Sequence, residues 1–201
     1  ILTLCSACSF APLSSPKTAR SLGKGNWQVA GGVTPAPGFD FSRGMTENFD
    51  LGLSLERQLF PVVGLWGRYS ILNSNANYSS VAISLGASQA LDAASSTGIY
   101  GGPIYSYKQE WFECYVLARF NWVRWEGYEF SSEEESDFFV DLISWDDEDF
   151  TYMQYVLGVN FWFYSYFALN INAKLLDMLG DEASGKSTSN ILPSINILWK
   201  Y

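Results

Sequence analysis

The chain has 201 residues, of which 48% are hydrophobic, 17% aromatic and only 16% charged, whereas soluble domains average about 25% charged residues. Its net charge is −9, and the absence of a basic patch that could neutralise phosphates disfavours nucleic-acid binding. The sequence contains no histidine, which excludes histidine-ligated metals and histidine-dependent catalytic dyads and triads.

The first ten residues, ILTLCSACSF, resemble the end of an export signal. Ser6, Ala7 and Cys8 resemble the end of a bacterial lipoprotein signal, although Cys5 stands where leucine is usual. The resemblance implies that residues 1–8 are a signal remnant and that Cys8 is lipidated. The alternative is an ordinary export signal cleaved near Ala11. Residues 9–25 are rich in serine, proline, lysine and glycine, which predicts a periplasmic linker.

From residue 26 onward, apolar and polar side chains alternate with the period of a β-strand. Phe49, Leu51 and Leu53, for example, alternate with Asp50 and Gly52. The alternation predicts ten antiparallel strands in a single domain of residues 26–201. We expect them at residues 26–34, 38–43, 48–57, 62–72, 79–88, 97–107, 111–130, 151–163, 166–176 and 190–201.

No run of about 20 apolar residues is present to form a transmembrane helix, and a closed barrel is the other structure that spans a bilayer. The prediction is an all-β, antiparallel, up-and-down transmembrane barrel of about ten strands, with eight as the alternative. If the first strand starts in the periplasm, short turns fall at 44–47, 73–78, 108–110 and 164–165. Outer loops then fall at 35–37, 58–61, 89–96, 131–150 and 177–189, and three of these five are long, as in outer-membrane barrels.

The polar face of the predicted strands distinguishes this barrel from a soluble one, because it is mostly Gly, Ser, Ala, Asn and Gln rather than Lys, Glu and Thr. Such small residues suit a crowded lumen. Aromatic residues gather near the strand ends, where they suit two interfacial girdles: Trp27, Phe60, Tyr78, Tyr107, Trp111, Phe163, Tyr164, Tyr166, Trp199 and Tyr201.

Eight charged residues fall on the polar face in balanced numbers: Asp40, Asp50, Glu56, Glu113, Arg68, Arg119, Lys174 and Lys200. Inside a narrow lumen they would have to be paired. They are interpreted as a structural salt-bridge network, or alternatively as the lining of a narrow polar pore or small-ligand site. Cys114 alternates with Phe112 and Val116, so we expect it to face lipid and to be inert.

The pattern of residues 26–201 resembles that of the small bacterial outer-membrane barrels. Their final strand ends in an aromatic residue that follows alternating apolar residues, as Ile195, Ile197, Trp199 and Tyr201 do here. The resemblance implies a location in the bacterial outer membrane, contact with its lipid and lipopolysaccharide, and recognition of the last strand by the barrel-assembly machinery.

The expected outer loop 131–150 carries nine acids and no base, and the rest of the chain has 12 acids and 12 bases. Its carboxylates could bind calcium or bridge through cations to lipopolysaccharide, although the glycine of an EF-hand is missing. Its apolar centre, which includes Phe138 and Trp145, suggests a protein partner. The nine acids are Glu133, Glu134, Glu135, Asp137, Asp141, Asp146, Asp147, Glu148 and Asp149.

The first functional hypothesis is a non-enzymatic outer-membrane barrel with a structural role, or a surface-interaction role through the acidic loop. The alternatives are a narrow channel for small solutes and an outer-membrane hydrolase that uses carboxylates. No catalytic pair stands out, and apart from calcium no cofactor is expected.

Overall fold

The computed structural model describes residues 13, 18–34, 36–58, 61–72, 78–91, 96–125, 148–179 and 190–201. Their regular structure consists of ten strands, and no helix among them is long and apolar enough to cross a membrane. The strands are β1 (Trp27–Thr34), β2 (Ala36–Gly44), β3 (Phe49–Arg57), β4 (Pro61–Leu72), β5 (Ser79–Ala90), β6 (Ser96–Lys108), β7 (Phe112–Trp125), β8 (Glu148–Tyr164), β9 (Phe167–Met178) and β10 (Asn190–Lys200).

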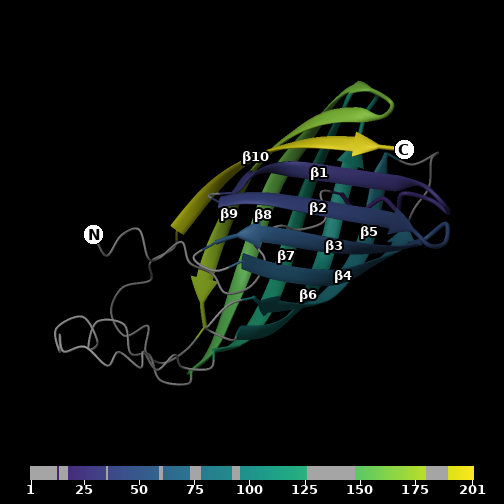
Figure 1. Cartoon of the computed structure of the whole chain (residues 1–201). Coiled ribbons are helices and arrows are strands. Elements are labelled where there is room, and N and C mark those ends of the chain that lie inside the picture. Colours follow the sequence, from purple (N-terminus) through teal and green to yellow (C-terminus); the bar gives the residue numbers. More distant parts are fainter. Residues whose placement is uncertain are drawn as a thin grey trace, which may run out of the picture.

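The ten strands form one closed antiparallel barrel in which each strand pairs with its neighbours in sequence (Figure 1). The barrel closes between the first and last strands, where Gly31 of β1 lies opposite Ile197 of β10. Closure gives every strand a paired neighbour on both sides, so that the sheet has no edge strand. The structure confirms the prediction of an all-β barrel with ten strands, and it excludes the eight-strand alternative.

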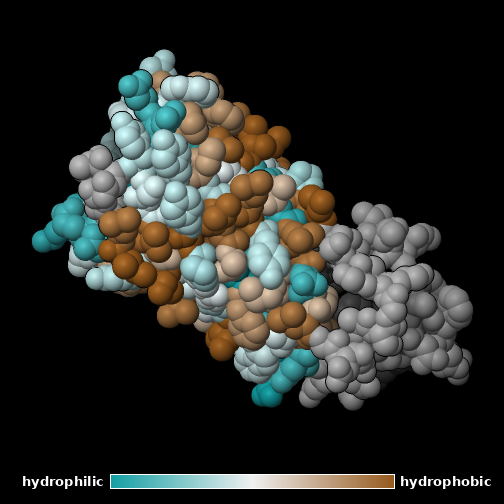
Figure 2. Space-filling view, turned by 180° about the vertical axis from the view of Figure 1, so that it is seen from behind, coloured by the Kyte–Doolittle hydropathy of each residue, from teal (hydrophilic) through white to brown (hydrophobic). Residues whose placement is uncertain are grey.

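The faces of the barrel follow the alternation in the sequence. In β3, Leu51, Leu53 and Leu55 point outward and are exposed, whereas Gly52 and Ser54 point inward and are buried. Because the strand period is two, one register places a whole set of apolar side chains on one face. Figure 2 shows one face of the barrel, on which hydrophobic side chains form a broad area and the most hydrophilic ones lie mainly toward the periphery.

The two ends of the barrel differ. The turn end carries the connections β2–β3, β4–β5, β6–β7 and β8–β9, together with the start of β1 and the end of β10. The loop end carries the other five connections. Aromatic rings contact one another around the turn end, as Trp199 does with Tyr166 (5.1 Å between ring centroids) and Trp27 with Phe41 (4.9 Å).

The prediction of two aromatic girdles is met at the turn end, and none of the residues named for it is a described residue of the loop end. Nine of the ten expected aromatic residues, all except Phe60, belong to strand ends or connections on that side. Phe60 lies outside the described residues. The turn end is therefore surrounded by aromatic side chains, which are favoured at an interface with lipid headgroups.

Some strand boundaries differ from the sequence prediction. Strand β2 begins at Ala36, so residues 36 and 37 are not part of a loop. Strand β8 begins at Glu148, where it pairs with Trp125 of β7, so the expected loop 131–150 is wrong for its last three residues. The backbone pairing of β7 and β8 continues into this acidic run, which alternation alone did not reveal.

Candidate functional site: the lumen and its N-terminal segment

Described residues that precede β1 lie inside the lumen of the barrel. Leu13 packs at the loop end in a cluster with Val123 and Tyr152, and Ala19 packs farther along with Ile104 and Tyr115. Both residues are completely buried. The described residues 13 and 18–22, called here the luminal segment, therefore run from the loop end toward the turn end.

Polar groups of the barrel wall hold the loop-end part of the luminal segment. The backbone N–H of Leu13 donates a hydrogen bond to Glu56 Oε2 (2.8 Å). Gln154 Nε2 donates to the carbonyl oxygen of Leu13 (3.2 Å). The backbone of the segment thus supplies hydrogen-bond partners for inward-facing side chains of β3 and β8.

The middle of the segment bonds to strands β4, β6 and β7. The Thr18 hydroxyl donates to Glu113, and the Ala19 N–H donates to Ser106 Oγ (3.2 Å). Ser70 Oγ donates to the carbonyl oxygen of Ala19 (2.7 Å). These contacts come from several walls of the barrel, so the segment crosses the lumen rather than extending the sheet.

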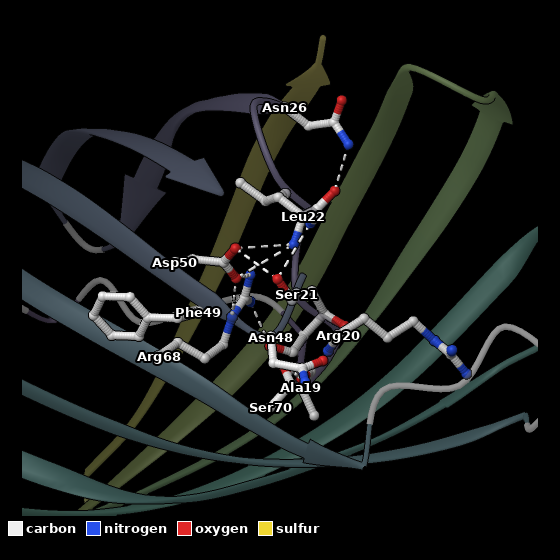
Figure 3. Close-up of polar contacts among 12 residues, drawn as sticks. Ala19, Arg20, Ser21, Leu22, Asn26, Asn48, Phe49, Asp50, Arg68 and Ser70 are labelled. Carbon is white, nitrogen blue, oxygen red and sulfur yellow. Dashed lines mark hydrogen bonds and ion pairs between the residues drawn. The ribbon is translucent and has the colours of Figure 1, made fainter. Parts of the chain in front are cut away.

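Asp50 is the centre of the polar contacts near the turn end (Figure 3). Its carboxylate accepts hydrogen bonds from Ser21 Oγ (2.8 Å), the Leu22 N–H (3.1 Å), Arg68 Nε (2.9 Å) and Arg68 Nη2 (2.5 Å). Arg68 Nη1 in turn donates to the carbonyl oxygen of Thr18 (2.6 Å). One buried ion pair therefore joins β3 and β4 to the luminal segment.

Glycines let the segment leave the lumen and enter β1. Gly23 and Gly25 have φ angles of 81° and 84°, a conformation that side chains disfavour. Gly25 N–H donates to the Gly44 carbonyl (2.8 Å), and Gly44 N–H donates to the Asn26 carbonyl (2.9 Å). A Cβ on Gly44 would lie 1.9 Å from the Gly23 carbonyl oxygen, so this close approach requires glycine.

All eight charged residues predicted for the lumen face inward. Seven are buried, and Lys200, near the turn end, is partly buried. Arg68 pairs with Asp50, and Arg119 lies over the ring of Tyr100 at 4.6 Å. The seven buried residues are Asp40, Asp50, Glu56, Arg68, Glu113, Arg119 and Lys174.

The network differs from the prediction in its partners. Glu113 pairs with Arg20 of the segment (3.5 Å) and accepts from Thr18, while Asp40 accepts from Trp66 Nε1 (3.1 Å). The lumen charges therefore depend on residues outside the predicted set of eight.

Sequence reasoning missed the luminal segment. The linker prediction for residues 9–25 is wrong for Leu13 and for residues 18–22, which are buried or largely buried inside the barrel. A linker that joins a periplasmic anchor directly to β1 would not bring Leu13 to the loop end. Cys8 lies outside the described residues.

Amide side chains fill part of the wall formed by β8, β9 and β10. Asn170 Nδ2 donates to Asn160 Oδ1 (2.7 Å), and Asn172 and Asn196 both donate to Asn170 Oδ1 (2.6 and 3.0 Å). Asn170 Nδ2 also lies 3.1 Å from the hydroxyl of Tyr115. These bonds join several of the amide side chains that face the interior, which fits the structural interpretation of the lumen.

Of the nine acidic residues expected in the loop 131–150, the structure describes only Glu148 and Asp149. Asp149 forms an ion pair with Arg124 (3.2 Å) in which both side chains are about half exposed. Glu148 is in β8, and residues 131–147 lie outside the described residues. Within the described ranges no group of three or more Asp, Glu, Cys or His side chains could hold a metal ion. The calcium hypothesis therefore stays a prediction.

The outer face holds the remaining predicted residues. Cys114 is partly exposed on the face that alternates with buried Glu113 and Tyr115, as predicted. The alternating residues of the last strand are also exposed on the outside: Ile195, Ile197, Trp199 and, directly after the strand, Tyr201.

Comparison with solved structures finds bacterial outer-membrane barrels. The N-terminal barrel domain of Pseudomonas aeruginosa OprF is 12% identical, with 89% of this chain and 99% of that chain covered and a TM-score of 0.40. Yersinia pestis outer membrane protein Ail is 11% identical, with 89% and 100% covered and a TM-score of 0.41. The translocator domain of autotransporter NalP from Neisseria meningitidis is 11% identical, with 88% and 86% covered and a TM-score of 0.43.

No protein-family model matches the chain, and a search of curated proteins finds no similar sequence. The assignment of the fold rests on the pairing of the ten strands.

Proposed function

We propose that the protein is a non-enzymatic barrel of the bacterial outer membrane whose lumen is closed by its own N-terminal segment. The observation that carries the proposal is the reversed polarity of the barrel. Leu85 and Leu157 are 67% and 63% exposed on the outside, while Arg119 and Lys174 are completely buried inside. Leaving a leucine in water forgoes about 1.5–3 kcal/mol, so an outer face of this kind favours lipid as its surroundings.

Strand length supports the same proposal. The strands have 8 to 17 residues, and a tilted strand needs about 9–11 residues to cross the hydrocarbon layer. The turn end, with its aromatic side chains, would face the periplasm. The loop end would face outward, and the apolar outer face would contact lipid and lipopolysaccharide. The barrel-assembly machinery would recognise Ile195, Ile197, Trp199 and Tyr201.

The contacts of the luminal segment inside the barrel support a structural role over a channel. The luminal segment binds opposite walls through Glu56, Glu113 and Asp50. These carboxylates are occupied by hydrogen bonds to the chain itself, which also disfavours the hydrolase alternative. A surface-interaction role would belong to residues 126–147, between β7 and β8. Calcium, lipopolysaccharide and a protein partner remain the proposed ligands of that acidic connection.

The test is planar-bilayer conductance of the purified protein, after heat-dependent gel mobility has verified the folded barrel. We expect a silent wild type. A variant that lacks residues 134–147 preserves β8 and should remain folded and silent while losing binding to lipopolysaccharide vesicles with calcium. Discrete conductance steps of the wild type that change when Arg68 or Arg119 is neutralised would overturn closure and favour the narrow channel. Unchanged vesicle binding by the deletion variant would contradict the surface role.

A further inference from the structure

A cavity opens at the turn end of the barrel, beside the exit of the luminal segment. Its volume is about 540 Å³, within the usual range of small-molecule sites. Its walls come from the segment and from strand ends and turns far apart in sequence, including Arg20, Asn26, Lys108, Gln109 and Lys200. The cavity is therefore made by the luminal segment and the barrel together.

Two lysines of the cavity come from the inner face of the barrel. Lys108 ends β6 and Lys200 ends β10, and both are partly buried. The Nζ of Lys108 lies 5.4 Å from the ring centroid of Trp162. Among the described residues, no hydrogen bond or ion pair engages the ammonium group of Lys200. Two like charges that line one cavity repel each other, and an anion between them would remove that repulsion.

The nearby deep carboxylates are already engaged. Glu113 binds Thr18 and Arg20, and Asp50 binds Arg68 and the segment. Glu47 and Glu110 also line the cavity, together with the basic residues Arg20, Lys108 and Lys200. The cavity lining therefore carries two carboxylates and three cations, of which Arg20 is paired with Glu113.

We infer that this cavity binds a small solute bearing a phosphate or carboxylate group, which enters from the turn end. Lys108 and Lys200 would form charge-assisted hydrogen bonds with the anionic group, the strongest kind available to a lysine. Gln109 and Asn26 line the same cavity and add amide groups for the rest of the solute. The site does not depend on residues 126–147, so it can be tested independently of the surface role.

The experiment is isothermal titration of the folded full chain in an uncharged detergent at constant ionic strength, with inorganic phosphate and citrate as separate probes. We expect saturable binding of at least one probe. Lys108→Gln and Lys200→Gln should each weaken it by about tenfold or more, because a hydrogen bond to a charged group is worth about 1.5–3 kcal/mol. Lys200→Arg should retain binding. Binding of phosphate alone or citrate alone identifies the anionic group of the solute.

Lys24→Gln is the matched control, because Lys24 is exposed, is not part of the cavity lining and loses the same charge. It should leave binding unchanged. A second measurement needs no variant: the bound probe should protect Lys108 and Lys200, but not Lys24, from an amine-reactive label. No saturable binding, an equal loss in Lys24→Gln, or absence of protection would each overturn the inference.

Discussion

At the scale of single residues, Asp50 connects the barrel wall to the luminal segment. It is completely buried and accepts hydrogen bonds from Arg68, Ser21 and Leu22. A buried ion pair contributes little net stability when intact, because desolvation opposes the attraction between the charges. Removal of one member is different, since the other charge is left buried without compensation.

Asp50→Asn should therefore lower the free energy of unfolding by about 3–5 kcal/mol. Arg68 would lose its counter-charge while remaining 2% exposed. The measurement is urea-induced unfolding in lipid vesicles, followed by tryptophan fluorescence. Asp149→Asn is the control, because its ion pair with Arg124 is about half exposed and such pairs are worth about 0–1 kcal/mol. Equal effects of the two substitutions would show that the Asp50 pair is not buried in the folded protein.

At the scale of elements, the ten strands are readable from the sequence because each has one face toward the lumen and one outward. That constraint imposes period two, as in Leu53 outside and Ser54 inside. The boundaries at Ala36 and Glu148 were harder to place, because pairing with a neighbouring strand continues past the end of the apolar alternation.

The luminal segment was not predictable in the same way. Its residues bond to several strands in turn, so no periodicity marks it, and it lies within residues 9–25, whose serine, proline, lysine and glycine content is that of a linker. The inward location of Arg68 and Glu113 followed from alternation. Their partners Thr18 and Arg20 did not, because these contacts join positions 50 and more than 90 residues apart in sequence.

Thiol labelling can test the position of the segment. In a background with Cys5, Cys8 and Cys114 replaced by serine, Thr18→Cys should resist a polymer-linked maleimide in the folded barrel and react in urea. Thr18 is 5% exposed inside the lumen. Lys24→Cys should react in both conditions, because Lys24 is exposed at the turn end. Rapid labelling of Thr18→Cys in the folded protein would place the segment outside the lumen.

At the scale of the whole molecule, charge differs between the two ends of the barrel, and polarity differs between its inner and outer faces. Acidic residues 133–149 belong to the loop-end connection β7–β8 and its edge, whereas Lys24, Lys108 and Lys200 lie at the turn end. Across the barrel, exposed leucines outside surround buried charges inside. A soluble barrel would need the opposite arrangement across its wall, because its outer face would contact water.

A charge placed on the outer face tests this arrangement directly. Leu85 lies midway along β5 and is 67% exposed, so Leu85→Arg should destabilise the barrel in vesicles by about 2–4 kcal/mol if lipid surrounds that face. Gln89→Arg introduces the same charge on the same face of β5, near the loop end, where the cost falls to about 0–1 kcal/mol. Unfolding in vesicles measures both. A soluble barrel would tolerate the two substitutions equally, since both side chains would point into water. A large difference between them therefore reports the depth of each position in a bilayer, and equal stability would contradict a membrane-embedded barrel.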